Sequence, residues 1–263
     1  MSLQRGIYIK NEQEIAILRE AGRINSLALA ATRELLRPGI TTAELDAAAA
    51  EVIRKNGAKP AFLGVMGVYP YPATITASIN DELVHGIPGK RKLMEGDIIS
   101  IDCGTILEGF VGDSAYTAGV REITPEAQRL IAVTEKALSV GINMLRPGNR
   151  VGDVGAAIQS YVEGQGYHLT REYTGHGVGR AMWEGPQVPN YGIAGRGILL
   201  RKGMTIALEP MVLVGTPRTK VLPDQWTVAS LDGSLTAHCE HSVAITDGDP
   251  LILTVPDKAG RSG

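Results

Sequence analysis

The segment LRPGITTAELDAAAAEVIRKNGA, residues 36–58, occurs again in altered form as LRPGNRVGDVGAAIQSYVEGQGY, residues 145–167. The two copies share LRPG, two alanines and the glycine next to their last residue, and their apolar positions coincide. Self-similarity of this kind indicates that one structural unit is used twice. We therefore predict a single domain over residues 1–263, built from two related halves at about 11–120 and 124–253.

A pair of helices is predicted at the start of each half. Apolar residues recur every three or four positions over residues 14–36 and 126–145, which is the spacing of an amphipathic helix. Asn11 with a glutamate three residues later forms a capping box, and Thr124 with Pro125 forms a cap followed by a first helical residue. Each long helix is expected to end at Arg-Pro-Gly, and each second helix at a glycine. Strand-like runs follow both pairs, so the predicted fold class is α+β.

The strand-like runs bring acidic residues into equivalent positions. LMEGDIISID aligns with LRKGMTIALE, which places Asp102 on Glu209, and a weaker similarity between GDSAYT and CEHSVAIT pairs Asp113 with Glu240. An aspartate near a turn is ordinarily a cap or a solvated residue, but Asp102 and Glu209 are lone charges in apolar strands, and a buried charge requires a partner. If the halves pack about a pseudo-twofold axis, all four carboxylates meet there.

Four ionised carboxylates cannot share a water-poor cleft, because each close pair of like charges disfavours ionisation. Two divalent cations would balance the formal charge, and the imidazole of His176 in GHGVGR would add a nitrogen ligand. A mixed oxygen and nitrogen shell suits Mn, Fe, Co or Zn better than Ca or a thiolate zinc site. The predicted dinuclear metal site consists of Asp102, Asp113, His176, Glu209 and Glu240.

The totals exclude several other classes of protein. A net charge of −2 gives no long-range field for nucleic acid or an anionic membrane. The chain has no apolar run near the roughly 18 residues of a membrane helix and no signal-peptide pattern at its start. Cys103 and Cys239 cannot make a disulfide framework, and because each neighbours a predicted ligand in a strand, their sulfurs are expected in the core. We expect a cytoplasmic protein.

The motifs around these residues carry a family resemblance. SINDELVHGIPG, GDIISIDCG, GDSAYT, GHGVGR, ALEPM, DQWTV and HCEHSVAIT occur in this order and span almost the whole chain. The sequence resembles the type I methionine aminopeptidases of the metal-dependent pita-bread family, peptidase family M24. The resemblance implies two pseudo-symmetric helix-helix-strand halves with a curved antiparallel sheet around a central dinuclear site. It also implies a metalloaminopeptidase whose two divalent metals, Co, Mn, Fe or Zn, are held by the same five residues.

The implied activity is hydrolysis of the first peptide bond, which removes the initiator methionine when the next residue is small. Two metals would activate water and polarise the carbonyl, and Glu209 would act as base as well as ligand. The resemblance places His85 near the scissile bond and assigns the methionine side-chain pocket to Tyr71, Met182 and Trp226. The implied partners are nascent polypeptide N-termini, with a transient ribosome contact. We expect a monomer that binds neither membrane nor specific nucleic acid.

Trp183 departs from the family pattern. The family usually has a second active-site histidine seven residues after the ligand histidine, and here Trp183 stands in that substrate-binding position. An indole N–H donates one hydrogen bond but transfers no proton. Losing a positioned donor or acid typically costs on the order of 10² to 10⁴ in rate. Three readings stay open: an ordinary methionine aminopeptidase, a divergent or low-activity one with altered side-chain preference, and a metal-loaded protein that only binds peptide N-termini.

Overall fold

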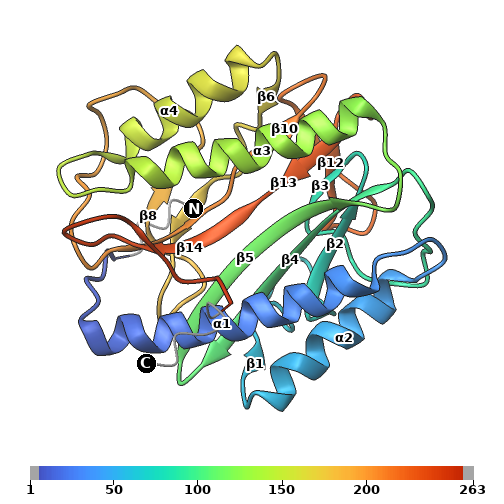
Figure 1. The fold of residues 1–263 in the computed structure, drawn as a ribbon, viewed down its shortest axis with the longest axis horizontal. Coiled ribbons are helices and arrows are strands. Elements are labelled where there is room, and N and C mark those ends of the chain that lie inside the picture. Colours follow the sequence, from blue (N-terminus) through green and yellow to red (C-terminus); the bar gives the residue numbers. More distant parts are fainter. Residues whose placement is uncertain (1–5, 257–263) are drawn as a thin grey trace, which may run out of the picture.

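Two helical pairs cover one face of a large antiparallel sheet in the structure, a computed structural model that describes residues 6–256 (Figure 1). In the first half the elements are α1 (Glu12–Leu35), α2 (Thr42–Lys55), β1 (Lys59–Pro60), β2 (Ile75–Ile79), β3 (Glu82–Val84), β4 (Ile98–Leu107) and β5 (Phe110–Gly119). In the second half they are α3 (Pro125–Met144), α4 (Val151–Gly164), β6 (His168–Leu169), β7 (Gly175–Gly177), β8 (Glu184–Val188), β9 (Thr205–Leu208), β10 (Met211–Leu213), β11 (Thr219–Val221), β12 (Val228–Ser230), β13 (Thr236–His238), β14 (Glu240–Ala244) and β15 (Leu251–Ile252).

The helix boundaries follow the predicted capping residues. The Asn11 side chain accepts a hydrogen bond from the Glu14 amide at 3.0 Å, and the Glu14 carboxylate accepts one from the Asn11 amide at 3.1 Å. The Thr124 hydroxyl accepts from the Ala127 amide at 3.2 Å at the start of α3. These bonds satisfy amides that have no partner inside the first helical turn, so they fix where each helix begins. The predicted capping box and Thr124 cap are therefore confirmed.

Strands of both halves join in one sheet. Its main path is β1-β4-β5-β14-β9-β7-β8, with β2 paired to β4 and β15 paired to β14, and every strand pair within it is antiparallel. The middle of this path is β4-β5-β14-β9, in which β5 and β14 pair with each other across the junction of the halves. Two three-stranded sheets, β13-β10-β6 and β11-β12-β3, complete the described chain.

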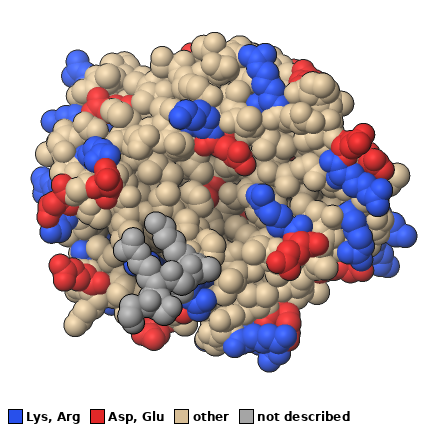
Figure 2. All heavy atoms as spheres, in the orientation of Figure 1, with Lys and Arg blue, Asp and Glu red and all other residues tan. Residues whose placement is uncertain are grey.

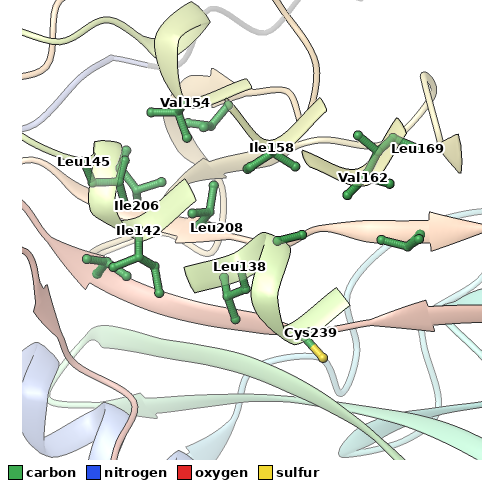
Figure 3. Close-up of a cluster of buried hydrophobic side chains, with 14 of the residues drawn as sticks. Leu138, Ile142, Leu145, Val154, Ile158, Val162, Leu169, Ile206, Leu208 and Cys239 are labelled. Atoms are coloured by element: carbon green, nitrogen blue, oxygen red, sulfur yellow. The ribbon is translucent and has the colours of Figure 1, made fainter. Parts of the chain in front are cut away.

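The core lies between the helices and the sheet. Leu138 and Ile142 of α3 and Val154, Ile158 and Val162 of α4 pack on strand residues of the second half (Figure 3). A second buried cluster packs α1 and α2 on β2, β4 and β5. Burial of this much apolar side-chain surface is the main favourable term in folding. Both cores lie on the helix-covered face of the sheet.

A close approach of α1 to β5 holds the strand that carries Asp113. A Cβ on Gly112 would lie 2.6 Å from the Gly22 amide nitrogen, so the helix and the strand meet where neither has a side chain. The Asn25 amide, fully buried on α1, donates to the Cys103 carbonyl of the neighbouring strand. These contacts fix the height of β4 and β5 against the helix.

The outer surface carries no broad patch of one charge on the face seen in Figure 2. Lysine and arginine side chains alternate there with aspartate and glutamate, and much of the surface between them is uncharged. Within the described residues, no helix is both long enough and apolar enough to cross a membrane.

Candidate metal centre

The strand register brings three of the predicted ligands onto one face of the sheet. Ala115 of β5 lies opposite Asp102 of β4 on one side and opposite Glu240 of β14 on the other. Directly opposed residues of antiparallel strands share a face, and so do residues two apart on one strand. Asp102, Glu240 and Asp113 therefore project from the same face, the one opposite the helices.

His176 and Glu209 reach the same point from the second half. His176 of β7 lies opposite Ala207 of β9, and Ala207 lies opposite Ser242 of β14, two residues after Glu240. Glu209 follows the last residue of β9, two positions after Ala207. Both side chains thus share the face defined by Glu240, because the register continues across β14, β9 and β7.

Ser242 ties the two central strands together beside the site. Its hydroxyl donates to the Asp113 carbonyl at 2.8 Å and accepts from the Asp113 amide at 3.1 Å. Both groups are buried, so these bonds replace water that cannot reach them. The junction of the halves is therefore fixed at the residue that carries one of the carboxylates.

The five side chains converge at short range. One ligand atom from each of Asp113, His176 and Glu240 lies within 4.8 Å of the other two, the arrangement of a group that can hold a metal ion. His176 Nε2 lies 3.5 Å from Glu209 Oε1 and 3.8 Å from Asp113 Oδ2. Asp102 completes the set, since it lines the same pocket as the other four.

Burial and mutual repulsion raise the pKa of every carboxyl in this group. Burial lifts the pKa of Asp113 to about 7 and raises the pKa of Asp102 well above its usual range, with the neighbouring Asp113 adding to the latter. The pKa values of Glu209 and Glu240 are raised by burial first and by Asp113 and Asp102 second. Without a counter-charge the four acids cannot all ionise at neutral pH.

The donor set fits divalent metal ions. Asp102 Oδ1, Asp113 Oδ1 and Glu240 Oε1 are buried and have no hydrogen-bond partner among the described residues. A buried carboxylate oxygen without a partner costs several kcal/mol unless a cation or a donor meets it. Carboxylate oxygens with one imidazole nitrogen match the preferences of first-row divalent metals. This structure therefore has the charge and the free oxygens that such ions require.

A pocket with mainly apolar walls, the inner pocket, has the four carboxylates among its lining residues. Its volume is about 110 Å³, and it is lined by Phe62, Val65, Tyr71, Thr76, His85, Asp102, Asp113, His176, Met182, Trp183, Glu209, Trp226 and Glu240. Every site residue expected from the sequence lines this one pocket. An apolar cavity of roughly 150 Å³ holds one benzene molecule, so this inner pocket has room for a single side chain.

The aromatic end of the inner pocket is built from Tyr71 and Trp226. Their rings meet edge to face with centroids 5.1 Å apart. The Tyr71 hydroxyl lies 3.0 Å from the Ile75 carbonyl and 2.9 Å from the Gly86 carbonyl, and burial raises the tyrosine pKa above its usual value. The pocket wall is thereby fastened to the loop that carries His85.

His85 is held in a strained conformation. Its φ of 62° lies in the left-handed region, which non-glycine residues adopt at a cost of order 1–3 kcal/mol. Its ring packs against Tyr173 with centroids 5.9 Å apart, and burial lowers its pKa to about 4. His85 is therefore neutral at physiological pH, and its imidazole can donate one hydrogen bond and accept another.

Trp183 lines the inner pocket beside His176. The two rings lie 6.4 Å apart at 64°, and 40% of Trp183 is exposed. The prediction that the indole is part of the cleft rather than the core is consistent with this placement. The adjacent Met182 is 9% exposed and packs with Val111, Val178 and Ala207 beneath the pocket.

The remaining histidines and cysteines divide between the site and the core. His238 Nε2 lies 3.7 Å from Glu209 Oε2 and 3.9 Å from Glu240 Oε2. His241 points to the other face, where its Nδ1 lies 2.8 Å from the Thr254 hydroxyl. Cys103 and Cys239 are buried in the two main cores, as predicted from strand alternation.

Several contributors to the site are absent from the sequence prediction. Phe62, Val65 and Thr76 line the inner pocket without belonging to a recognisable pattern. Lys10 forms a buried ion pair with Glu184, 174 positions away, next to Trp183. The only local signal is a charged residue inside the apolar run GIYIK, which favours a partnered lysine but does not identify the partner.

The comparisons with known proteins agree with this geometry. Residues 16–247 match the model of metallopeptidase family M24. A methionine aminopeptidase of Clostridium perfringens is 47% identical over 249 residues, 95% of this chain and 99% of that protein. Methionine aminopeptidase 1 of Bacillus subtilis is 46% identical over 248 residues, 94% of this chain and 99% of that protein. The crystal structure of a methionine aminopeptidase from Thermotoga maritima superposes with a TM-score of 0.92 at 43% identity, covering 95% of this chain and 99% of that one.

The match to the family model and the relatives at 46–47% identity show that the chain belongs to metallopeptidase family M24, and its mixed helix and antiparallel-sheet fold holds a buried acidic centre. Within that family, it is similar over nearly its whole length to the methionine aminopeptidases. The predicted α+β pita-bread fold and the family resemblance are confirmed, and so is the expectation of divalent metals in its chemistry.

Proposed function

We propose that this protein removes the initiator methionine from new polypeptide chains whose second residue is small. The observation that carries the proposal is the junction of a buried acidic centre with a single-side-chain pocket of about 110 Å³. Relatives that are 46–47% identical over nearly their full length bear the name methionine aminopeptidase. We further propose that the chain acts as one catalytic domain, as a cytoplasmic monomer that meets its substrate near the ribosome.

The metal ligands in this proposal are Asp102, Asp113, His176, Glu209 and Glu240, holding two divalent cations of Co, Mn, Fe or Zn. Two such ions would balance the charge of the four carboxylates, and the three carboxylate oxygens without a hydrogen-bond partner would be available as ligand atoms. When bound, the ions supply Lewis-acid polarisation of the scissile carbonyl and a nucleophilic water at neutral pH. The protein contributes the fixed geometry of the donors.

Glu209 is the proposed proton acceptor. Its side chain lies between two imidazoles, with Oε1 3.5 Å from His176 Nε2 and Oε2 3.7 Å from His238 Nε2. Its side chain is 14% exposed, compared with 4% for Asp113 and 3% for Glu240. A base must reach the proton that it removes, and Glu209 faces the pocket where the reacting carbonyl would lie.

His85 is proposed to contact the peptide nitrogen of the bond that breaks. It lines both the inner pocket and the adjoining cleft, so it stands where the first residue meets the second. Its lowered pKa of about 4 keeps it neutral, and the strained backbone fixes its direction. A neutral imidazole in a fixed position can donate one hydrogen bond through its N–H and stays uncharged.

The methionine side chain is proposed to occupy the apolar part of the inner pocket. Tyr71, Trp226 and Met182 surround this space together with Phe62 and Val65. Methionine is unbranched and polarizable, so it fills an irregular aromatic pocket and makes favourable sulfur–aromatic contacts. A branched first side chain would clash with these walls. A charged first side chain would be buried against them without a partner.

The test is a peptide assay on the metal-loaded protein. Met-Ala-Ser, Met-Leu-Ser and an Ala-Pro peptide are incubated with each divalent metal, using the wild type and Trp183→His. We expect release of the first residue, methionine, from Met-Ala-Ser, far less methionine from Met-Leu-Ser, and little or no alanine from the Ala-Pro peptide. Binding of Met-Ala-Ser without cleavage under every metal would favour the peptide-binding reading. A changed ratio between the two Met peptides in Trp183→His would support altered side-chain preference.

A further inference from the structure

A buried ion pair fastens the start of the described chain to the site. The side chains of Lys10 and Glu184 are 4% and 3% exposed, and the lysine ammonium donates to the glutamate carboxylate. The ammonium also lies 3.2 Å from the Tyr8 carbonyl. Burying two charges is costly unless further hydrogen bonds satisfy them. Because Lys10 and Glu184 are far apart in the sequence, the pair fixes the position of residues 6–10 relative to the start of β8.

Glu184 is also the anchor of the loop that carries Trp183. Its Oε1 accepts from the Arg180 amide at 2.7 Å and from the Ala181 amide at 3.3 Å. Gly179 lies against the pair, since a Cβ there would stand 2.5 Å from the Lys10 side chain. The loop between β7 and β8 is therefore built around the carboxylate, and the lysine holds that carboxylate in place.

The strap, residues 6–10, lies along the first residues of β8. The Gly185 amide donates to the Gly6 carbonyl at 3.2 Å, and Ile7 forms a parallel bridge with Gly185. At the other end of the strap, the Lys10 amide donates to the Gly203 carbonyl at 2.8 Å. Backbone hydrogen bonds at both ends and the buried ion pair hold the strap in a single position beside Trp183.

The strap forms part of the wall of a larger cleft next to the inner pocket. This outer cleft has a volume of about 880 Å³ and is lined by Gly6, Ile7, Val84, His85, Asp102, Tyr173, Thr174, His176, Trp183, Glu184, Gly185, Pro186, Gln187, Ile198, Glu209, Met211 and His238. It shares five residues with the inner pocket: His85, Asp102, His176, Trp183 and Glu209. Among the residues that the structure describes, no lysine or arginine lines this cleft.

We propose that the outer cleft binds the part of the substrate that follows its second residue, with Ile7 and Trp183 as the contact surface for the third side chain. This rests on the proposed function. The inner pocket accepts only the methionine, so the rest of the polypeptide leaves through the space that shares the reacting residues. Ile7 and Trp183 are 39% and 40% exposed, so both present apolar side-chain surface to the solvent in the cleft. Lys10 and Glu184 act as positioning residues for that surface.

The chemistry of the lining sets a preference. An apolar third side chain removes Ile7 and Trp183 surface from water, at roughly 25 cal/mol per Å². An acidic third side chain would enter a cleft in which none of the described lining residues is a lysine or arginine, and Asp102 and Glu209 stand at its inner end. We therefore expect leucine to be preferred over aspartate at the third position.

The experiment uses Met-Ala amide, which ends before the outer cleft, and two hexapeptides, Met-Ala-Leu-Ser-Gly-Ser and Met-Ala-Asp-Ser-Gly-Ser. The variant is Ile7→Ala, which removes an exposed side chain and leaves the buried pair intact. The matched control is Ile193→Ala, another exposed isoleucine, 71% accessible, that lies outside both sets of lining residues. Steady-state kcat and KM are measured for all three peptides with the same metal.

We expect Ile7→Ala to raise KM for the leucine hexapeptide about fivefold, with kcat unchanged and Met-Ala amide cleaved as by the wild type. Ile193→Ala leaves all three peptides unaffected. Lys10→Met is expected to produce the same split with a larger rise in KM, and Lys10→Arg to restore part of it. An equal loss on the short and long peptides, or no loss on either, would overturn the proposal. Failure of the wild type to cleave any of the three would instead count against the proposed function.

Discussion

The two halves of the molecule place their carboxylates in different ways. In the first half, Asp102 and Asp113 lie inside the ten-residue strands β4 and β5, which the two residues Glu108 and Gly109 connect. In the second half, Glu209 follows the four-residue strand β9, and Glu240 is the first residue of the five-residue β14. Glutamate is one methylene longer than aspartate, so the second half reaches the common centre from the ends of shorter strands.

The two halves also differ in the kinds of side chain that they bring to the site. The hairpin β4–β5 is one unbroken ladder, and it supplies carboxylates only. The second half uses shorter strands with more connections between them. His176 lies in the three-residue strand β7, Met182 and Trp183 lie in the connection after it, and His238 is the last residue of the three-residue strand β13. Irregular segments can present new side chains without disturbing a ladder, which is why binding groups concentrate on them. The comparison predicts that the halves respond differently to substitution.

The largest expected effect is on catalysis when one carboxylate of each half is replaced by its amide. Asp102→Asn and Glu209→Gln keep the shape of the side chain but remove the charge of a proposed metal ligand. We expect kcat to fall by about 10³ or more in both, with the larger loss for Glu209→Gln because Glu209 is also the proposed proton acceptor. Activity assays and metal stoichiometry by atomic absorption measure this. If Asp102→Asn still binds two metal ions, the ligand assignment is wrong.

Metal removal should weaken the junction between the halves, where ligand atoms of Asp113 and Glu240 lie within 4.8 Å of each other. Burial raises the pKa values of these acids in the folded state, to about 7 for Asp113. In the metal-free protein their contribution to the free energy of unfolding is therefore fully present below the pKa of the unfolded chain, near 4. That contribution is lost as the pH rises through the folded pKa, at a cost on the order of a few kcal/mol. We expect the Tm of the metal-free protein to fall between pH 5 and pH 8.

Thermal scans with and without chelator, at several pH values, test this sign. A bound metal stabilises the native state by about 2.7 kcal/mol at one hundred times its Kd, so the loaded protein melts higher at pH 8. The gap between loaded and metal-free Tm is expected to widen with pH. A gap that is constant from pH 5 to pH 8 would mean that the carboxylates are not the groups involved.

His238 tests a feature that only the second half has. Two residues before Asp113 in the first half stands Val111, a buried apolar residue, whereas two residues before Glu240 stands His238, whose Nε2 is buried with no hydrogen-bond partner among the described residues. Its nearest acceptors are Glu209 and Glu240. We expect His238→Ala to lower kcat and metal affinity about tenfold, because groups behind metal ligands hold their orientation.

His238→Gln is the matched control for this substitution, since glutamine keeps an N–H donor of similar reach. Kinetics and calorimetric metal titration should place His238→Gln between the wild type and His238→Ala. If kcat and metal affinity fall equally in both variants, the N–H donor is not the relevant property, and His238 acts through its packing alone.

The sequence reveals the features that repeat or alternate. Asp102 is recognisable because it interrupts an apolar strand and aligns with Glu209, and Asn11 and Thr124 because capping depends on local residue types. Phe62, Val65 and the pairing of Lys10 with Glu184 have no such signal. Their positions depend on which loops the finished sheet brings together, and long-range contacts of this kind leave no period in the chain. The fold, the acidic centre and the pocket residues that belong to recognisable motifs are therefore predictable, and the rest of the pocket and cleft wall is not.

The smallest effect concerns the caps of the second helix in each half. At α2 the Thr41 hydroxyl accepts from the Glu44 amide at 3.2 Å, whereas at α4 the equivalent residue is Arg150, whose side chain has no acceptor. Thr41→Ala should therefore lower the free energy of unfolding by about 1 kcal/mol. Arg150→Ala should lower it by less than half of that, because the Arg150 side chain makes no cap bond and its 2.8 Å hydrogen bond to the Gly197 carbonyl is exposed. In both variants the carboxylate three residues on still accepts from the cap-residue amide. Urea unfolding measures both, and equal losses would mean that the carboxylate three residues on, not the cap side chain, fixes these helix starts.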